Sequence, residues 1–247
     1  IETKSKSLLV IGNLSNTLIK DNGFNGIGVK LFGDFASVQI NSEYMLVGAA
    51  VLDNYFSKFC YQNGITGYEF LYTIPGSIGG NIYMNAGCYD QEIKDKLISE
   101  IFFDINEKKV YEKNIKELKF DYRKGFQKNN TIILYGKFKI THSEQNSIKK
   151  LMLEYENIRN KTQPQKVNCC GSIFKNPSNQ SAWKLIKSSI DESFYNGPVK
   201  LSKIHSNFFE NEPNISANSI DLFISKIQKR VKEKHNILLE RELIIID

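Results

Sequence analysis

The chain has 247 residues, of which 41% are hydrophobic and 24% are charged, and its formal net charge at pH 7 is +6. This length suits one large domain or two moderate domains with a sizeable core. No apolar run reaches the ~18–20 residues that cross a bilayer, so no membrane-spanning helix is predicted. Residues 1–7 show no signal-peptide pattern, and the chain does not begin with Met, so we expect a fragment or a trimmed chain.

The positively charged residues are not concentrated in one segment of the chain. Lysines are spread along the whole chain, which argues against nucleic-acid binding, although a basic surface can still attract anionic nucleotides. The three histidines are scattered, and the cysteines show no C-x-x-C spacing, so neither a zinc site nor a disulfide framework is predicted. We expect reduced thiols in a cytoplasmic protein. The cysteines are Cys60, Cys88, Cys169 and Cys170.

Short strand patterns and few helices are expected from Leu8 to about Lys166. One amphipathic helix fits residues 50–62, and Gly64 stands just past its end, where a C-terminal cap belongs. A longer helix fits residues 147–160, and Pro164 follows it. The expected strands cover residues 8–11, 27–31, 37–40, 44–47, 98–105, 109–112 and 131–141.

A second, smaller region is expected after the connector that follows Pro164. It contains helices over residues 182–188 and 216–234, an extended stretch around 205–209, and a closing strand over 238–246. The pattern as a whole predicts an α+β protein. The apolar stripe of the last helix should face a core and consists of Ile220, Phe223, Ile224, Ile227 and Val231.

The most informative segment is the glycine-rich run from Ile74 to Gly87. Pro75-Gly76-Ser77-Ile78-Gly79-Gly80 is followed by Asn85-Ala86-Gly87, a density of glycine that lets main-chain N–H groups approach a ligand closely. Such a segment suits a diphosphate, and it matches neither a Walker loop nor G-x-G-x-x-G. The alternative is a glycine-rich turn in a buried hairpin.

A second loop of similar composition follows the first expected strand. Gly12-Asn13-Leu14-Ser15-Asn16 comes directly after Leu8-Leu9-Val10-Ile11. Two such loops on one domain can hold one dinucleotide from both sides.

These loops are the first two motifs of a longer series. Tyr122-Arg123, then Gly171-Ser172-Ile173-Phe174-Lys175-Asn176-Pro177, then Arg241-Glu242-Leu243-Ile244-Ile245 complete it. In this order the motifs resemble those of the UDP-N-acetylenolpyruvoylglucosamine reductases (MurB), from about Leu8 onward. The resemblance implies a FAD-binding domain of the vanillyl-alcohol-oxidase/PCMH type over residues 1–167, without the leading part that the family has. A small α+β substrate-binding domain over 168–238 and a terminal strand over 239–247 that returns to the FAD-binding part would follow.

The resemblance also implies an activity. Family members use NADPH and FAD to reduce UDP-N-acetylglucosamine enolpyruvate to UDP-N-acetylmuramate in peptidoglycan precursor synthesis. We accordingly expect a cytoplasmic monomer that binds neither nucleic acid nor a membrane. The residues expected to bind FAD are Gly12, Asn13, Ser15, Asn16, Pro75, Gly76, Ser77, Ile78, Gly79, Gly80, Asn85, Ala86 and Gly87.

Three residues match the family's catalytic positions. Ser172 would give a proton to the enolate that forms at the substrate's α-carbon, although Gly-Ser is also a common turn or cap. Arg123 would bind the substrate carboxylate, unless it is a solvated loop arginine beside Lys124. Glu242 would act as a proton source or polarise the enolate, and its alternative is a salt bridge with Arg241.

Other residues are candidates for contact with the substrate. Asn176 matches a family contact, and the further candidates are Lys175, Arg159, Tyr122 and the segment His205-Ser206-Asn207-Phe208. His205 suits a core histidine equally well.

Three positions depart from the family pattern. Leu14 replaces a glycine, so its side chain should either crowd a ligand or adopt positive φ. Asp90 brings an acid near the expected diphosphate, and Asp191-Glu192 replaces a basic position. These departures leave two alternatives open: a degenerate or truncated member that binds flavin weakly, and another two-loop flavin oxidoreductase that acts on a small hydroxy acid.

Overall fold

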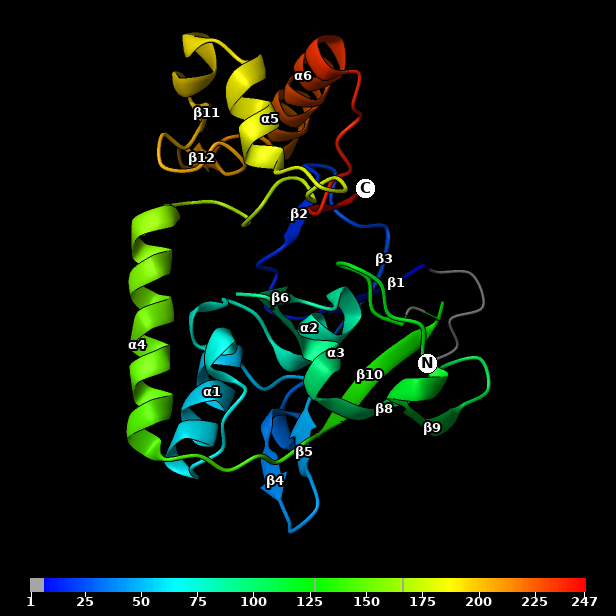
Figure 1. Ribbon diagram of the computed structural model, residues 1–247. Coiled ribbons are helices and arrows are strands. Elements are labelled where there is room, and N and C mark those ends of the chain that lie inside the picture. The colour runs from blue at the N-terminus through cyan, green and yellow to red at the C-terminus, as the bar shows by residue number, and fades with distance from the viewer. Residues whose placement is uncertain (1–6, 127, 166) are drawn as a thin grey trace. The chain divides into compact units, whose positions relative to one another are not determined.

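In the computed structural model the chain divides into two units, each of which combines strands with helices and so confirms the α+β class (Figure 1). The structure describes residues 7–126, 128–165 and 167–247. Residues 1–6, where the sequence shows no signal peptide, lie outside the described residues, as does residue 166 of the expected connector. Unit 1 comprises the chain up to Asn13 together with Gly26–Arg159, and unit 2 comprises Leu14–Asn25 and Asn160–Asp247.

The centre of unit 1 is a five-stranded sheet with the order β4-β5-β10-β8-β9, in which neighbouring strands are antiparallel (Figure 1). A parallel pair, β1 with β3, and a short pair, β6 with β7, accompany it. The strands are β1 Ser7–Ile11, β3 Gly26–Lys30, β4 Val38–Ile40, β5 Met45–Gly48, β6 Gly87–Cys88, β7 Gln91–Glu92, β8 Leu97–Asp104, β9 Lys109–Asn114 and β10 Thr131–Phe138.

Helices pack on this sheet through one apolar core. Phe56 and Cys60 of the first helix meet Met45 and Val47 of β5 and Phe138 of β10 in the core, as the expected amphipathic pattern requires. The helices are α1 Asp53–Gln62, α2 Ile78–Met84, α3 Ile93–Lys96 and α4 Gln145–Thr162, with 3-10 turns η1 Gly33–Ala36, η2 Glu69–Thr73 and η3 Ile115–Glu117.

The end of α1 confirms the predicted cap. Gly64 has φ +64 and its N–H donates to Tyr61 O at 3.1 Å. A left-handed residue just past the last turn is the position where glycine terminates a helix at low cost.

The backbone of the glycine-rich segment differs from the hairpin alternative. After the turn at Pro75 and Gly76 the chain forms α2, which contains Gly79 and Gly80, so the alternative of a buried hairpin is wrong. The reason is tertiary: a Cβ at Gly79 would lie 2.8 Å from the Ala49 Cβ, so only glycine lets α2 pack this closely on the end of β5. Asn85 closes the helix in the left-handed conformation, with φ 45.

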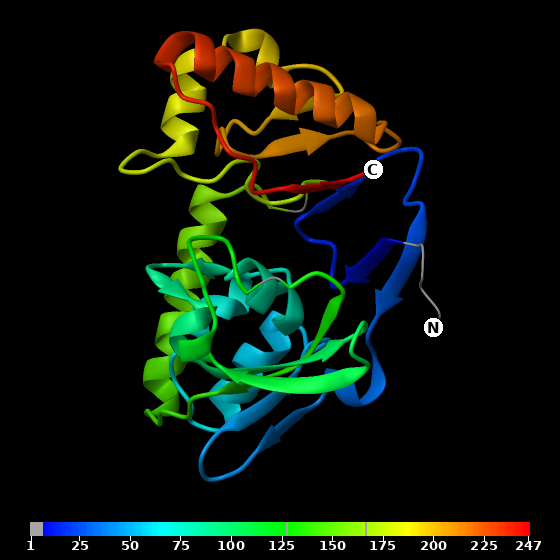
Figure 2. The same cartoon turned by 90° about the vertical axis from the view of Figure 1, so that its right-hand side faces the viewer.

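Unit 2 packs two helices over short strands. Its core lies along α6, where the predicted stripe is confirmed: Ile220, Ile224, Ile227 and Val231 are buried and Phe223 packs against them. Helices α5 and α6 lie side by side, and β13 pairs with β2 in parallel (Figure 2). The elements are β2 Thr17–Ile19, α5 Ala182–Ser189, η4 Glu192–Tyr195, β11 Val199–Leu201, β12 Phe209–Asn211, α6 Ala217–His235 and β13 Ile244–Ile246.

The compact units do not coincide with the predicted domains. Residues 14–25 belong to unit 2 because β2 pairs with β13, and because Asp21 accepts hydrogen bonds from Ala217 N and Asn218 N at the start of α6. The closing strand is also shorter than predicted, since it covers 244–246 rather than 238–246. The compact units follow the contacts within the chain and do not test which residues bind the cofactor or the substrate. The predicted domain boundaries at 167/168 and 238/239 therefore remain predictions.

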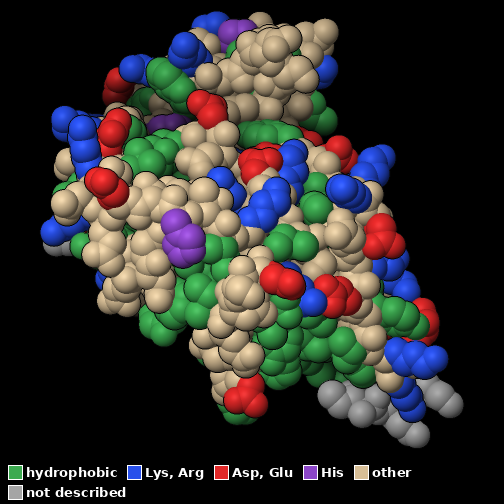
Figure 3. Space-filling view, turned by 60° about the horizontal axis from the view of Figure 1, so that its bottom comes forward, with side chains coloured by type: hydrophobic (Ala, Val, Ile, Leu, Met, Phe, Trp, Pro, Cys, Tyr) green, Lys and Arg blue, Asp and Glu red, His purple; other side chains and the backbone are tan. Residues whose placement is uncertain are grey.

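Among the described residues, no helix is both long and apolar enough to cross a membrane. On the face drawn in Figure 3, Lys and Arg side chains are interspersed with Asp and Glu.

Candidate active site

The two predicted loops meet within unit 1. Asn13 Nδ2 donates to the Pro75 carbonyl oxygen at 3.3 Å, and a Cβ at Gly12 would lie 2.9 Å from Ser77 Oγ. Glycine at position 12 thus permits the close approach of the first loop to the second. The two glycine-containing loops are therefore adjacent in the fold at Gly12, Asn13 and residues 75–77.

The Ser77 hydroxyl lies between these loops without a partner. Ser77 is 4% exposed, and its Oγ makes no hydrogen bond within the described residues. It lies just before the first turn of α2, and a Cβ at Gly80 would be 3.6 Å from it. Because a buried hydroxyl without a partner is unfavourable, this position fits a ligand oxygen such as that of a diphosphate.

A buried carboxyl fixes the turn that carries Ser77. Asp53 at the start of α1 is fully buried; its N–H donates to Gly76 O at 3.2 Å, and its Oδ1 accepts from Asn81 Nδ2 at 2.7 Å. A Cβ at Gly76 would lie 2.4 Å from Asp53 Oδ2, so only glycine fits there. Burial raises the pKa of Asp53 well above the usual value, which favours the neutral acid. Asp53 is not among the site residues predicted from the sequence.

Asn85 joins the glycine-rich segment to the segment of the predicted substrate arginine. Its Nδ2 donates to Asp121 O and to Glu92 Oε2, each at 2.9 Å, and its Oδ1 accepts from Lys94 N at 3.3 Å. The side chain is completely buried, so it orders the protein around the loop. The predicted FAD contact of Asn85 remains a prediction.

Arg123 is anchored rather than solvated. Its Nη2 donates to Gly87 O at 2.7 Å, and its guanidinium lies 4.8 Å from the Tyr122 ring centroid. Glu92 Oε1 lies 3.8 Å from Nη1, and the side chain is 18% exposed. The backbone of Arg123 has φ 54, a conformation that non-glycine residues seldom adopt. The alternative of a solvated loop arginine does not fit these contacts.

Arg159, like Arg123, lies close enough to Cys88 to affect the pKa of its thiol. Burial raises the pKa of the Cys88 thiol to about 11, and the positive charges of Arg159 and Arg123 oppose that shift. The charges of both predicted substrate-binding arginines thus reach Cys88, the residue directly after the glycine-rich segment.

The departure from the family pattern at Asp90 lies beside a stacked pair of tyrosines. Tyr89 stacks on Tyr155 of α4 with ring centroids 4.1 Å apart, and its hydroxyl donates to Tyr155 O at 2.9 Å. Asp90 adopts φ 57 and is exposed. Leu14 adopts φ 54, which is the second of the two alternatives predicted for this position.

Unit 2 brings the segments of Ser172 and Glu242 together. The residue after Ser172, Ile173, accepts the Glu242 N–H at 2.9 Å through its carbonyl oxygen, and Phe174 forms a bridge with Arg241. Gly171, directly before the serine, has φ +76, a conformation that favours glycine. Asn16 Nδ2 donates to Glu242 O at 2.9 Å, so Asn16, predicted to bind FAD, also fixes the glutamate's main chain.

The charged neighbours of Glu242 have other partners. Arg241 donates to Asp221 Oδ1, Ser225 Oγ and Gln228 Oε1 on α6, at 2.7, 2.9 and 3.2 Å. Lys175 Nζ binds Glu240 Oε1 at 2.6 Å, and the Glu240 side chain is 73% exposed. The structure therefore distinguishes Glu240, paired at the surface, from half-buried Glu242.

The remaining predicted substrate residues of unit 2 have structural partners. Asn176 Oδ1 accepts the N–H of Ala182 at 2.9 Å and so caps α5. His205 Nδ1 accepts the N–H of Asn207 at 3.2 Å, and its ring packs on Phe208. Burial lowers the pKa of His205, which favours the core-histidine interpretation. Asp191 and Glu192 are exposed, and Asp191 caps η4 through the N–H of Ser193 at 3.0 Å.

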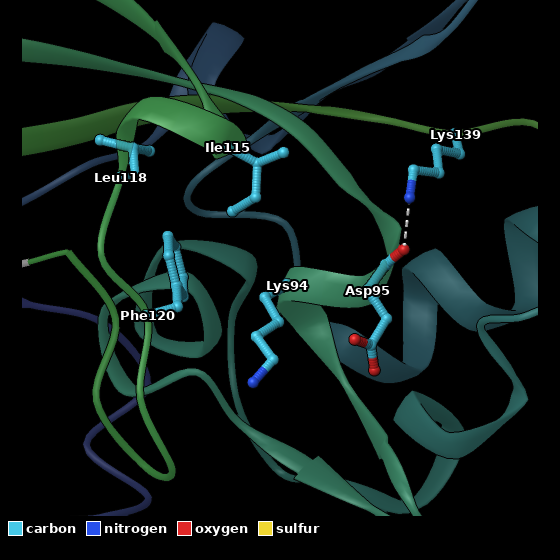
Figure 4. A pocket seen from close by; sticks show the side chains of 6 residues that line it. All are labelled: Lys94, Asp95, Ile115, Leu118, Phe120 and Lys139. Atoms are coloured by element: carbon cyan, nitrogen blue, oxygen red, sulfur yellow. Dashed lines mark hydrogen bonds between the residues drawn. The ribbon is translucent and has the colours of Figure 1, made fainter.

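A shallow pocket of about 480 Å³ lies beside the Arg123 segment in unit 1 (Figure 4). Lys139 Nζ donates to Asp95 O across its edge at 2.8 Å. None of the predicted site residues lines it. The lining residues are Lys94, Asp95, Ile115, Leu118, Phe120 and Lys139.

Comparisons with known proteins agree with this arrangement. A family model described as a FAD binding domain matches residues 1–101, and one for the C-terminal domain of UDP-N-acetylenolpyruvoylglucosamine reductase matches residues 163–246. The reductase of that name from Pelagibacter ubique (strain HTCC1062) is 37% identical over 98% of this chain and 82% of its own length. The one from Wolbachia sp. subsp. Brugia malayi (strain TRS) is 36% identical over 100% of this chain and 84% of its own length.

A solved structure extends the likeness to three dimensions. The crystal structure of the Thermus caldophilus reductase matches with a TM-score of 0.84 and 27% identity, covering 99% of this chain and 87% of that chain. The fold and the paired glycine-rich loops define a FAD-binding oxidoreductase, and the unpartnered Ser77 hydroxyl beside Gly12 and Gly80 fits that cofactor. The chain belongs to the UDP-N-acetylenolpyruvoylglucosamine reductase family. The hydroxy-acid oxidoreductase alternative is therefore wrong.

Proposed function

We propose that this chain reduces UDP-N-acetylglucosamine enolpyruvate to UDP-N-acetylmuramate with NADPH as the reductant, in the cytoplasm and as a monomer, for peptidoglycan precursor synthesis. The observation that carries the proposal is the junction in unit 2, where Ile173 O accepts the Glu242 N–H at 2.9 Å directly after Ser172. It supports a proton donor and a carboxylate that are held on adjoining segments.

The cofactor and the side chains would have separate tasks. FAD supplies the redox chemistry, since it can take a hydride from a nicotinamide and pass it to an activated double bond. Gly12, Asn13 and residues 75–80 hold its diphosphate, and the Ser77 hydroxyl donates to a phosphate oxygen.

The protein residues stabilise and then protonate the charge that develops on the substrate. Arg123 binds the carboxylate of the enolpyruvyl group, because a planar guanidinium matches a planar carboxylate. Ser172 donates its hydroxyl proton to the substrate α-carbon, and Glu242 polarises the enolate or supplies a proton. Arg159, Tyr122, Lys175 and Asn176 are the candidates for contact with the rest of the substrate.

A degenerate member that binds flavin weakly is the second candidate, because Leu14 adopts positive φ and Asp90 is an acid beside the loops. The test begins with the visible spectrum of the protein after FAD is added and free FAD is removed by gel filtration. NADPH consumption is then measured with and without the enolpyruvyl substrate. Retained flavin with substrate-dependent turnover supports the reductase. Retained flavin without turnover supports the degenerate member, and loss of all flavin contradicts the proposed reductase.

A further inference from the structure

Asn207 holds the main chain that follows Ser172. Its Nδ2 donates to Phe174 O at 2.7 Å, and its Oδ1 accepts the Phe174 N–H at 3.0 Å. Its own carbonyl oxygen accepts the Ile173 N–H at 2.9 Å. The side chain is 4% exposed. One residue therefore satisfies three main-chain groups of two consecutive residues.

The other side of the same segment carries Glu242. Ile173 O accepts the Glu242 N–H at 2.9 Å and the Leu243 N–H at 3.3 Å, and Phe174 bridges to Arg241. Residues 173 and 174 thus lie between Asn207 and residues 241–243. The Asn207 side-chain amide offers one donor and one acceptor side by side. It therefore makes the two hydrogen bonds to Phe174 that the main chain of a neighbouring strand would otherwise make.

The turn that carries Asn207 is itself fixed. The Asn207 N–H donates to His205 Nδ1 at 3.2 Å, and the Phe208 N–H donates to His205 O at 2.9 Å. The Ser202 N–H donates to Phe208 O at 2.8 Å. A rigid support of this kind lets a side chain set the place of another segment to a fraction of an ångström.

We propose that Asn207 is a positioning residue that sets the place of the Ser172 hydroxyl and of Glu242 through Ile173 and Phe174. The inference rests on the proposed function for what those two groups do. Asn207 does not itself contact substrate, because its amide is buried and bonded to Phe174 through both its nitrogen and its oxygen. A misplacement of about 1 Å of a reacting group can lower a rate about 100-fold.

The test is Asn207→Asp, which keeps the shape of the side chain but replaces the donor to Phe174 O with a second acceptor. The matched control is Asn196→Asp, since Asn196 Nδ2 also donates to a main-chain oxygen, Glu192 O at 2.8 Å, but is exposed. Flavin reduction by NADPH and flavin reoxidation by the enolpyruvyl substrate are measured separately by stopped flow. We expect Asn207→Asp to slow reoxidation by about 10- to 100-fold while FAD binding and reduction by NADPH stay within about twofold of the native values.

A pH profile supplies a signature that a general loss of stability would not give. When the carboxyl introduced by Asn207→Asp is protonated, it can again donate to Phe174 O, so the ratio of variant to native reoxidation rates should rise as the pH falls. The other ionisable groups around this position are present in both proteins, so the ratio isolates the introduced carboxyl together with its effect on these neighbours. They are His205, Tyr195 beyond Ser206, Lys175, Glu240, Arg241 and Glu242.

Hydrogen exchange of the flavin-free proteins tests the anchoring without turnover. In the native protein, the Ile173 and Phe174 amides should exchange slowly, and Asn207→Asp should accelerate them while Asn196→Asp should not. Rapid exchange of both amides in the native protein overturns the inference even if the variant does not fold. So does an Asn207→Asp variant with native reoxidation. If the native protein holds flavin but the substrate never reoxidises the reduced flavin, the proposed function is contradicted instead. The exchange data then still show whether Asn207 anchors Ile173 and Phe174.

Discussion

Arg123 Nη2 and the main-chain oxygen of Gly87 are joined by a hydrogen bond of 2.7 Å. The predicted carboxylate-binding arginine is therefore attached to the end of the predicted flavin-binding segment. Asn85, two residues earlier, reinforces the attachment through its bond to Asp121 O. A change that displaces this segment should consequently displace the guanidinium as well.

Ser172→Ala tests the predicted proton donor. If Ser172 acts only on the substrate, as proposed, flavin reduction by NADPH should be unchanged, while product formation falls by about 10²- to 10⁴-fold, as for loss of a general acid. The two half-reactions are followed separately by flavin absorbance and by product analysis. Ser193→Ala, an exposed serine of the same unit, is the control. Native turnover by Ser172→Ala would show that another group donates the proton.

Gly80→Ala separates helix stability from close approach to a ligand. Gly80 lies in α2, and its added Cβ would make an ordinary 3.6 Å contact with Ser77 Oγ. The flavin-free protein should gain up to about 1 kcal/mol in urea denaturation, because alanine favours a helix over glycine. FAD affinity should fall by about tenfold, or ~1.4 kcal/mol, in a fluorescence titration. Ser147→Ala on α4 is the control, and unchanged affinity would place the diphosphate elsewhere.

Leu14→Gly tests the strained position of the first loop. Leu14 adopts φ 54 and is 42% exposed, so its replacement removes strain and little packing. The strain of ~1–2 kcal/mol is partly offset by the flexibility of unfolded glycine, which leaves a gain of about 0.5–1 kcal/mol. Lys108→Gly, at φ 55 in a distant turn, should show the same gain without any effect on FAD. If Leu14 weakens flavin binding, Leu14→Gly will raise the FAD affinity and Lys108→Gly will not. If Leu14→Gly and the native protein bind FAD equally well, the main observation behind the degenerate alternative is removed.

Arg241→Gln tests the support of the Glu242 segment. The guanidinium donates to three residues of α6, and the side chain is 28% exposed. Loss of these bonds should lower the free energy of unfolding by about 1.5–3 kcal/mol, measured in urea. Arg241→Lys should recover only part, because one ammonium group cannot reach all three acceptors. Arg230→Gln on the same helix, with one 4.0 Å contact to Asp191, should change stability by under about 0.5 kcal/mol.

Glu100→Gln tests a buried carboxyl of β8. Glu100 is 2% exposed, its Oε2 has no partner within the described residues, and burial raises its pKa to about 8. The folded protein therefore binds this proton more tightly than the unfolded chain does. The resulting stability is full below about pH 4.5 and is lost as the pH rises toward 8, by at most about 1.4 kcal/mol per pH unit.

The glutamine variant should remove that slope in urea denaturation measured from about pH 5 to about pH 9. It should also be more stable than the native protein above pH 8, since it carries no charge there. Glu107→Gln, an exposed neighbour in the turn after β8, is the control. An unchanged slope in Glu100→Gln would show that Glu100 is ionised in the folded protein.

The sequence was sufficient where a local pattern determines the structure. The apolar spacing of α6 and the glycine after α1 gave the core face and the helix end because both depend on neighbouring residues. Helix α2 was missed, since Gly79 is explained by the approach of Ala49 rather than by local preference. Strand β2 has only three residues, and its partner lies more than 200 residues away, so no local pattern indicates it.

The residues of the candidate site were likewise only partly predictable from the sequence. Ser172, Arg123 and Glu242 came from the order of motifs, and their roles remain proposals. Asp53 was not predicted from the sequence, and Asn207 was indicated only within the candidate substrate-contact segment 205–208. The supporting role of each depends on hydrogen bonds to main-chain groups that only the fold brings near. An acid at the start of an otherwise amphipathic helix was the only visible signal for Asp53.

The pairing of β2 with β13 sets an order of events during synthesis. Thr17 and Ile244 are register partners, so residues 14–25 leave the ribosome long before the strand that completes their unit. Such distant pairing is slow to form, since a long loop must close first. Residues 17–19 should therefore remain accessible to protease on nascent chains and become protected only after residue 246 has emerged. Early protection of residues 17–19 on a shorter nascent chain would contradict this order. If it holds, the second unit matures only after its last strand has left the ribosome, while the first can form its sheet earlier.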